Sequence, residues 1–208
     1  METNMKQPEN KTSKLKKNLI EWGVIGGVIA ILYFTGLHTQ VLGTMQRAML
    51  FTGFFDAKPD VTQTDGPLLS NQDYRFRMVT SKGEELTLSE FEGSVTFVNV
   101  WASWCPPCIA EMPTIETLYR DLQDRENIRF ILLSMDEERE RAVNFMEGKN
   151  FSLPYQFPES PLPVAMRSGV LPTTYVISKE GQIVYKKQGI ADYSSPVFRD
   201  WLIELSEE

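Results

Sequence analysis

The chain is long enough for one or two domains, and its composition is that of an ordinary globular protein. It has 208 residues, of which 42% are hydrophobic and 24% are charged, enough apolar sequence for a buried core. Residues 1–17 carry five lysines against two glutamates, whereas residues 66–208 carry 14 lysines and arginines against 22 aspartates and glutamates. An acidic domain is a poor match for nucleic acid, which we therefore exclude as a partner.

The N-terminal part of the chain predicts a membrane anchor. Residues 1–18 form a basic, polar tail, and residues 19–38 form an apolar segment whose one charged residue is Glu21. About 20 apolar residues span the hydrocarbon core of a bilayer as a helix. A cleaved signal peptide and a buried core helix are the alternatives, although signal segments usually have shorter apolar runs.

The lysines before the anchor predict its orientation. Positive charge holds the N-terminus in the cytoplasm, so we expect a single-pass protein of the inner (cytoplasmic) membrane. Its C-terminal domain then faces the periplasm or the cell exterior, where disulfides are permitted. Residues 39–67 are expected to be an apolar interfacial segment, or more anchor helix, followed by a linker with Pro and Asp-Gly signals.

The exported domain, residues 68–208, is expected to open with a hairpin. Residues 74–80 alternate apolar and polar side chains, which predicts a half-exposed strand, and residues 85–88 predict a second, shorter strand. A turn at residues 81–84 connects them. This hairpin carries no residue with evident chemistry.

The only two cysteines of the chain, Cys105 and Cys108, follow a predicted buried strand at residues 95–101. Residues 109–126 have helical spacing. Cys105 is therefore expected where a strand leads into a helix, and the free N–H groups and dipole of a helix N-terminus lower the pKa of a thiol. The two prolines between the cysteines suit a first helical turn.

Reversible dithiol–disulfide exchange is the chemistry that this pair predicts. A purely structural disulfide across so short a loop removes little entropy from the unfolded chain. A zinc site needs four ligands, and the sole histidine, His38, lies in the apolar segment. We therefore expect no metal, and no cofactor other than the redox-active pair itself.

Strands and helices alternate in the remainder of the chain. The charged run that opens the helix after the second buried strand is expected to be a solvated face. In chain order we expect a strand at 128–135, a helix at 136–148, one short strand and a loop within 151–164, a hairpin of strands at 175–177 and 183–187, and a last helix starting near 194.

Two motifs resemble the thioredoxin superfamily, and within it the membrane-anchored thiol-disulfide oxidoreductases of the TlpA and ResA type. The first motif is VNVWASWCPPC at residues 98–108, with Glu111 after it, and the second is GVLPTT at residues 169–174. The likeness covers roughly residues 68–208. It implies an α/β, thioredoxin-like fold: a central mixed sheet with helices on both faces, an N-terminal hairpin, and an inserted helix and strand.

The resemblance bears on the role of Glu111, which lies one helical turn after Cys108. A carboxyl there either exchanges a proton with the second thiol or only stabilises the helix dipole. ResA-like proteins place a glutamate at this position, which favours the proton-transfer role.

The second motif implies a substrate-binding segment. Pro172 corresponds to the cis-proline that faces the cysteines in thioredoxin-like folds. The backbone of Leu171 is then free to pair with an extended substrate segment, in the manner of an added strand. We expect Trp104 to shape and desolvate the site, whereas plain packing is the simpler interpretation of Trp101.

Together these features predict a membrane-tethered oxidoreductase. Its relatives reduce disulfides of exported proteins, for example in cytochrome c maturation, with electrons from a membrane donor of the thioredoxin-reducing type. The Pro-Pro between the cysteines differs from the Gly-Pro of thioredoxin and the Glu-Pro of ResA, so a disulfide oxidase or isomerase is the alternative. A Cu(I)-binding chaperone is a weaker one, because copper carriers of related fold usually add a histidine and this domain has none.

Overall fold

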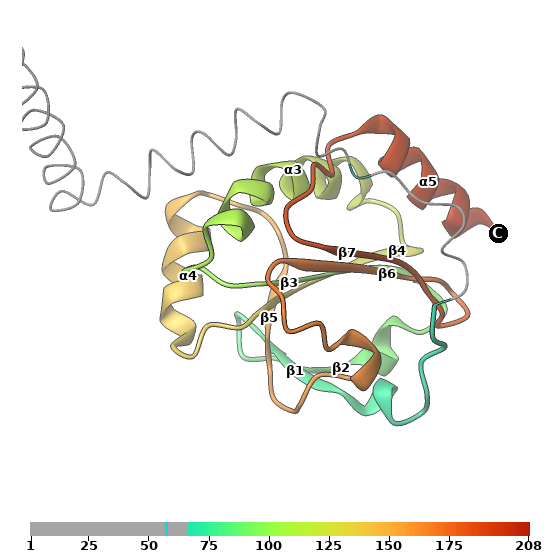
Figure 1. Ribbon diagram of the computed structural model, residues 1–208, viewed down its shortest axis with the longest axis horizontal. Coiled ribbons are helices and arrows are strands. Elements are labelled where there is room, and N and C mark those ends of the chain that lie inside the picture. The colour runs from blue at the N-terminus through green and yellow to red at the C-terminus, as the bar shows by residue number, and fades with distance from the viewer. Residues whose placement is uncertain (1–56, 58–65) are drawn as a thin grey trace, which may run out of the picture. The chain divides into compact units, whose positions relative to one another are not determined.

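The computed structural model describes residue 57 and residues 66–208. Their strands form one seven-stranded sheet in the order β2-β1-β5-β4-β3-β6-β7 (Figure 1). The predicted anchor, residues 19–38, lies outside the described residues. Within the part of the chain that is described, no helix combines the length and the apolarity needed to cross a membrane.

The order of elements is the one expected of a thioredoxin-like domain. The strands are β1 (Arg77–Thr80), β2 (Glu85–Thr87), β3 (Val95–Trp101), β4 (Ile128–Ser134), β5 (Tyr155–Pro158), β6 (Thr173–Ile177) and β7 (Ile183–Gln188). The α-helices are α3 (Pro106–Leu122), α4 (Arg139–Gly148) and α5 (Pro196–Glu207), and the 3-10 helices are η1 (Asp73–Arg75), η2 (Leu88–Phe91) and η3 (Val164–Met166).

The centre of the sheet is mixed. Strand β3 pairs parallel with β4 along its whole length and antiparallel with β6. All seven residues of β3 are buried, as its mostly apolar run predicts for a strand that is covered on both faces. The predicted strand at 95–101 is thus confirmed, and the one at 128–135 ends a residue earlier, at Ser134.

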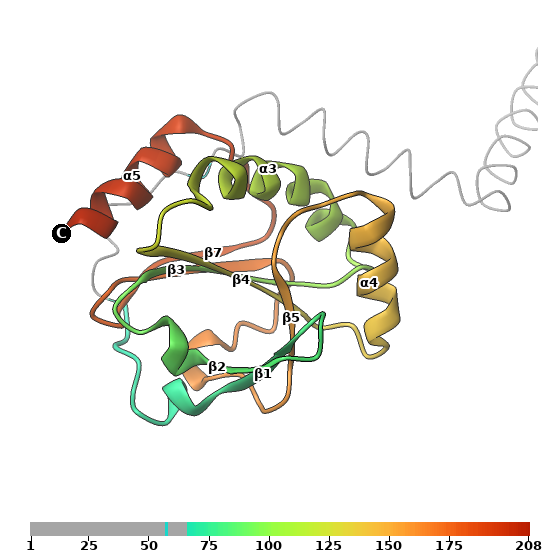
Figure 2. The ribbon, with the colours of Figure 1, turned by 180° about the vertical axis from the view of Figure 1, so that it is seen from behind.

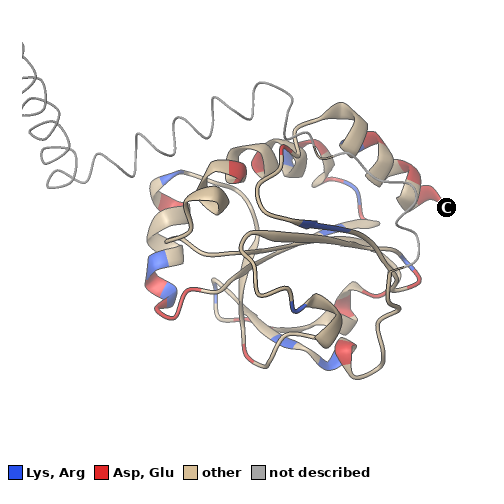
Figure 3. Cartoon of the chain, in the orientation of Figure 1, with Lys and Arg blue, Asp and Glu red and all other residues tan. Residues whose placement is uncertain are grey.

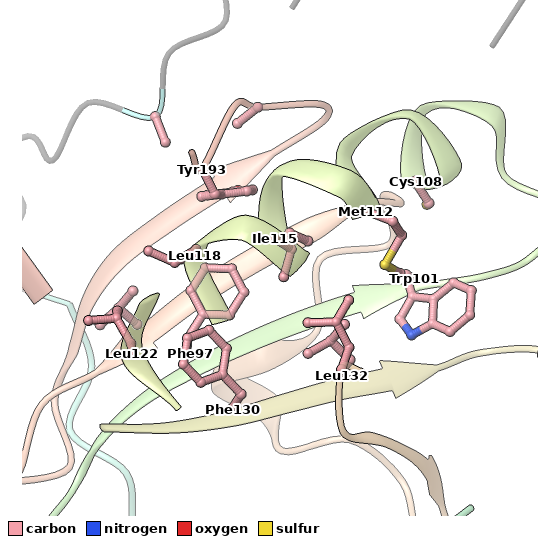
Figure 4. Packing of buried hydrophobic residues seen from close by; sticks show 14 of the residues in the cluster. Phe97, Trp101, Cys108, Met112, Ile115, Leu118, Leu122, Phe130, Leu132 and Tyr193 are labelled. Carbon is pink, nitrogen blue, oxygen red and sulfur yellow. The ribbon is translucent and has the colours of Figure 1, made fainter. Parts of the chain in front are cut away.

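One face of the sheet is covered by all three α-helices of the described residues. Helices α3 and α5 lie on the same side in both views (Figures 1 and 2), and α4 contributes Ala142 and Met146 to the same hydrophobic cluster. Figure 4 shows the residues of α3 that point toward the sheet in this cluster: Cys108, Met112, Ile115, Leu118 and Leu122.

The other face has a second hydrophobic cluster, which includes Leu88, Phe91 and Met166. These residues come from η2 and η3. The prediction of helices on both faces is therefore only partly right, because single 3-10 turns cover the second face. A Pro and a Gly flank η3, at Pro163 and Gly169, and leave no room for a longer helix.

The N-terminal hairpin is confirmed as β1 and β2, but β1 begins three residues later than predicted. Residues 73–75 form η1 instead. The Asp73 carboxylate accepts hydrogen bonds from the N–H and hydroxyl of Ser70, at 2.9 and 2.7 Å. Such local bonds from an aspartate favour a turn over a strand.

The short strand predicted within 151–164 is β5, and it is followed by η3. The resemblance implies an inserted helix and strand. No α-helix lies within 151–164, so the helix and strand between β4 and β6 are α4 and β5. The charged face of α4 is exposed, as predicted, with an ion pair of 2.9 Å between Arg141 and Glu138. Acidic and basic residues are interspersed along this helix (Figure 3).

Candidate active site

Cys105 and Cys108 form a disulfide at the point where β3 leads into α3. Their Cα atoms are 5.3 Å apart. Cys105 is the N-cap of α3, and its sulfur accepts a hydrogen bond of 3.3 Å from the N–H of Cys108. The helix begins at Pro106, and the two prolines stand in its first turn as predicted, because the fixed φ of proline suits that position. The same N–H donor and helix dipole stabilise a thiolate at Cys105 after reduction.

The two cysteines are both buried, Cys108 more completely than Cys105. Cys105 retains 5% of its surface, whereas Cys108 retains none. Trp104, next to Cys105, is 60% exposed, so its indole is available to a partner at the rim of the site. Trp101 is fully buried and packs against Phe145 at a ring distance of 5.7 Å, which agrees with a packing role.

A buried carboxylate holds the loop that carries Trp104 and Cys105. Asp136, 8% exposed, accepts bonds from the N–H and the hydroxyl of Ser103 at 2.9 and 2.6 Å. The hydroxyl of Ser134 donates to the same carboxylate at 2.8 Å. Asp136 was expected on a solvated helix face, but these bonds bury it and α4 starts only at Arg139.

The Leu171–Pro172 peptide bond is cis, as the resemblance implied. Strand β6 pairs with β3 so that Thr173 lies opposite Val100. The same register, continued by one residue, places Pro172 beside Trp101, at the sheet edge where the cysteine loop begins. The N–H and C=O of Leu171 have no hydrogen-bond partner among the described residues, which leaves them available to an extended segment.

Glu111 is a fully buried carboxyl in α3. Its Oε1 accepts a hydrogen bond of 2.8 Å from Nδ2 of Asn99, and its Oε2 accepts one of 3.2 Å from the N–H of Ala191. Burial raises the pKa of Glu111 to about 8, although both hydrogen bonds act to lower it. A carboxyl in this range exchanges protons readily with a thiol, whose ordinary pKa is about 8.5.

Two tyrosines lie near the Glu111 carboxyl. Tyr193 is fully buried, and burial, followed by the charge of Glu111, raises its pKa well above the usual value. Burial raises the pKa of Tyr185 as well. Both phenols are therefore neutral at neutral pH.

The sequence did not reveal every residue of the site. Asp136 and Ala191 lie 33 and 80 residues from their partners Ser103 and Glu111, a separation that local patterns do not capture. Asn99 left one signal, an amide side chain within a mostly apolar strand. Among the described residues no group of three or more His, Cys, Asp or Glu side chains is placed to hold a metal ion.

A protein-family model matches the part of the chain that holds the disulfide and the cis-proline. Residues 56–197, more than half of the chain, match the family model described as Redoxin. The chain belongs to the Redoxin family. The match includes the Cys105–Cys108 disulfide and the cis-Pro172 segment, which are the two motifs that carried the resemblance to thioredoxin-like proteins.

Curated relatives in this family are named thiol-disulfide oxidoreductase ResA. The protein of Bacillus cereus is 28% identical over 138 residues, which are 66% of this chain and 76% of the relative. The protein of Oceanobacillus iheyensis is 24% identical over 184 residues, which are 87% of this chain and 88% of the relative. The family and these relatives identify the enzyme class predicted from the sequence, a thiol-disulfide oxidoreductase.

Solved structures confirm the fold. A thiol:disulfide interchange protein of Chlorobium tepidum superposes with a TM-score of 0.52 at 24% identity, over 71% of this chain and 99% of that one. A secreted disulfide oxidoreductase of Mycobacterium tuberculosis superposes with a TM-score of 0.53 at 14% identity, over 66% of this chain and 98% of that one. The domain is therefore thioredoxin-like, with a mixed sheet and helices.

Proposed function

We propose that the protein is a membrane-tethered reductase of disulfides in exported proteins, such as precursors of cytochrome c. One observation carries the proposal: Cys105, which keeps 5% of its surface exposed, forms a disulfide with the fully buried Cys108, one helical turn from the buried carboxyl of Glu111. This arrangement separates the sulfur that meets a substrate from the sulfur that completes the reaction.

In the first step the reduced enzyme attacks. The thiolate of Cys105 forms a bond with one sulfur of the substrate disulfide, the substrate S–S bond breaks, and its electron pair leaves on the other substrate sulfur. The product is a mixed disulfide. The free N–H and C=O of Leu171 pair with the substrate backbone, and Trp104 covers the reacting sulfurs.

In the second step Cys108 resolves the mixed disulfide. Its S–H proton passes to the Glu111 carboxylate, and the resulting thiolate attacks the sulfur of Cys105. The Cys105–Cys108 disulfide forms, the bond to the substrate breaks, and the second substrate sulfur leaves as a thiolate that takes up a proton. The substrate gains two electrons, and a dithiol donor in the membrane must reduce the enzyme again.

The membrane tether rests on the sequence. Residues 19–38 are long and apolar enough to span a bilayer, and five lysines precede them. The alignment with the Oceanobacillus iheyensis protein covers 87% of this chain, so it extends well before residue 66. We propose that the inner membrane holds the protein with its domain outside the cytoplasm.

Labelling of cells tests location, orientation and redox direction together. Intact cells that contain the full-length protein are treated with a membrane-impermeant maleimide, and the membranes are then washed with alkaline carbonate. We expect the protein to stay in the membrane pellet with Cys105 modified, because a reductase is kept reduced. The Cys105→Ser variant is the control and stays unmodified, since Cys108 is buried.

Three results contradict parts of the proposal. Release of the protein by carbonate excludes the anchor, and labelling only after cell lysis excludes the outward orientation. Labelling only after treatment with dithiothreitol shows a pair that is kept oxidised. That last result favours the alternative, a disulfide oxidase or isomerase, to which the unusual Pro-Pro between the cysteines also points.

A further inference from the structure

Asn99 is an unusual residue for its place in the fold. It lies in the middle of β3, is fully buried, and has the apolar residues Val98 and Val100 on either side. Its Nδ2 donates two hydrogen bonds, one of 2.8 Å to Oε1 of Glu111 and one of 2.9 Å to Oγ1 of Thr174. Its Oδ1 has no hydrogen-bond partner among the described residues.

Stability alone does not account for this amide. A buried polar atom without a partner costs free energy, whereas an apolar side chain of similar shape carries no such cost. The residues of β3 on the same face as Asn99, Phe97 and Trp101, are apolar and buried, so apolar side chains suit this face of the strand. The amide therefore serves the group that it contacts, the carboxyl of Glu111.

We propose that Asn99 is a positioning residue for proton transfer between Cys108 and Glu111. Asn99 fixes the orientation of the Glu111 carboxyl and favours the ionised form of that carboxyl. The inference rests on the proposed function, in which the Cys108 S–H bond breaks and its proton moves to a Glu111 oxygen. An N–H group that points at a carboxyl oxygen stabilises the carboxylate more than the acid.

The effect of Asn99 opposes the effect of burial. Burial alone pushes the pKa of Glu111 up, while the bonds from Asn99 and from the N–H of Ala191 pull it down. Among the described residues, the neutral phenols of Tyr185 and Tyr193 also lie beside the carboxyl. Because the Ala191 donor is a backbone group, Asn99 is the donor that a substitution can remove.

Thr174 links this arrangement to the substrate-binding segment. It lies in β6, two residues after Pro172, and opposite Asn99 in the β3–β6 register. Its hydroxyl accepts the second Nδ2 hydrogen of Asn99 and so fixes the plane of the amide. Thr174→Val keeps the shape of the side chain but removes this acceptor, which makes it a matched variant that leaves Glu111 itself unchanged.

The test measures the rate at which Cys108 resolves a mixed disulfide, as a function of pH. Full-length protein in detergent carries a peptide thiol on Cys105, and release of the peptide is followed between pH 5.5 and 10. For Asn99→Leu we expect about tenfold slower release of the peptide at pH 7. The midpoint of the plot of release rate against pH should lie about one pH unit higher, because the variant lacks one hydrogen bond to the charged carboxylate. The difference in release rate between the wild type and Asn99→Leu should vanish near pH 10, where the Glu111 carboxyl is ionised in both proteins.

Companion variants make the result decisive. Thr174→Val should shift the midpoint in the same direction by less, and it serves in place of Asn99→Leu if that variant does not fold. In a Glu111→Gln background, Asn99→Leu should have no further effect on the release rate, because the two residues act through one carboxyl. The carboxyl band of Glu111 in the infrared spectrum should report the same change in midpoint without any turnover.

The outcomes distinguish the proton-transfer role of Glu111 from the positioning role of Asn99. If Glu111→Gln releases the peptide at the wild-type rate at all pH values, the proton-transfer role in the proposed function is wrong. If Glu111→Gln is slow but Asn99→Leu and Thr174→Val leave the midpoint unchanged, the role of Asn99 alone is wrong. Equal slowing at every pH also contradicts it, since that is the effect of a purely structural change.

Discussion

Replacement of Cys105 by serine is expected to abolish disulfide reduction, with a loss of at least about 1,000-fold in turnover. Cys105 is the N-cap of α3, and of the two cysteines it is the one that keeps any exposed surface, 5%. A serine hydroxyl in the same place is not ionised at neutral pH and is a poor nucleophile toward a disulfide. The measurement is the reduction of a protein disulfide by the full-length protein in detergent, with dithiothreitol as the source of electrons.

Replacement of Cys108 by serine has a different expected result. The attack by Cys105 still occurs, but no buried thiol resolves the product, so a mixed disulfide with the substrate accumulates. A non-reducing gel and mass spectrometry detect this adduct. A Cys105→Ser variant with wild-type turnover, or an adduct that forms through Cys108 in that variant, contradicts the assigned roles.

The second large effect concerns stability. The pKa of Glu111 is about 8 in the folded protein, against an ordinary value of 4.5. Between these values the folded state keeps a proton that the unfolded state releases, so the free energy of unfolding falls as pH rises from about 4.5 to 8. The loss is on the order of 5 kcal/mol. Glu111→Gln has no proton to release and should lose most of this dependence.

Chemical denaturation at pH 5 and at pH 9 measures this difference. Glu147→Gln is the control, because Glu147 is an exposed glutamate of α4, and it should keep the pH dependence of the wild type. A wild-type protein as stable at pH 9 as at pH 5, or a Glu111→Gln variant with the wild-type slope, places the pKa of Glu111 near its ordinary value. The proton acceptor for Cys108 is then another group.

Much of the fold was predictable because local patterns determine it. The buried strand at Val95–Trp101 follows from a mostly apolar run, and the helix opened by the cysteines follows from two prolines at a first turn. The cis-Pro172 was predictable from a motif only. Single turns such as Val164–Met166 were not predictable, since so few residues carry no period.

The site was predictable in its chemistry but not in its hydrogen bonds. The spacing of the two cysteines predicts a redox pair, and Glu111 lies one turn away on the same helix. The partners that set the state of Glu111 come from other elements: Asn99 from β3, Thr174 from β6 and Ala191 from the loop after β7. The contact of Asn99 with Thr174 depends on the β3–β6 register, and the contact of Ala191 with Glu111 depends on how the loop after β7 lies against α3. Only the tertiary structure specifies these arrangements.

The midpoint potential of the Cys105–Cys108 pair decides whether the protein is a reductase. The purified full-length protein is equilibrated against glutathione or dithiothreitol buffers, and the fraction of reduced pair is determined by alkylation. For a reductase we expect a potential near or below about −250 mV, in the range of thioredoxin, which is a reductant. A potential above about −150 mV, toward that of a strong disulfide donor, contradicts the reductase and makes the protein an oxidant.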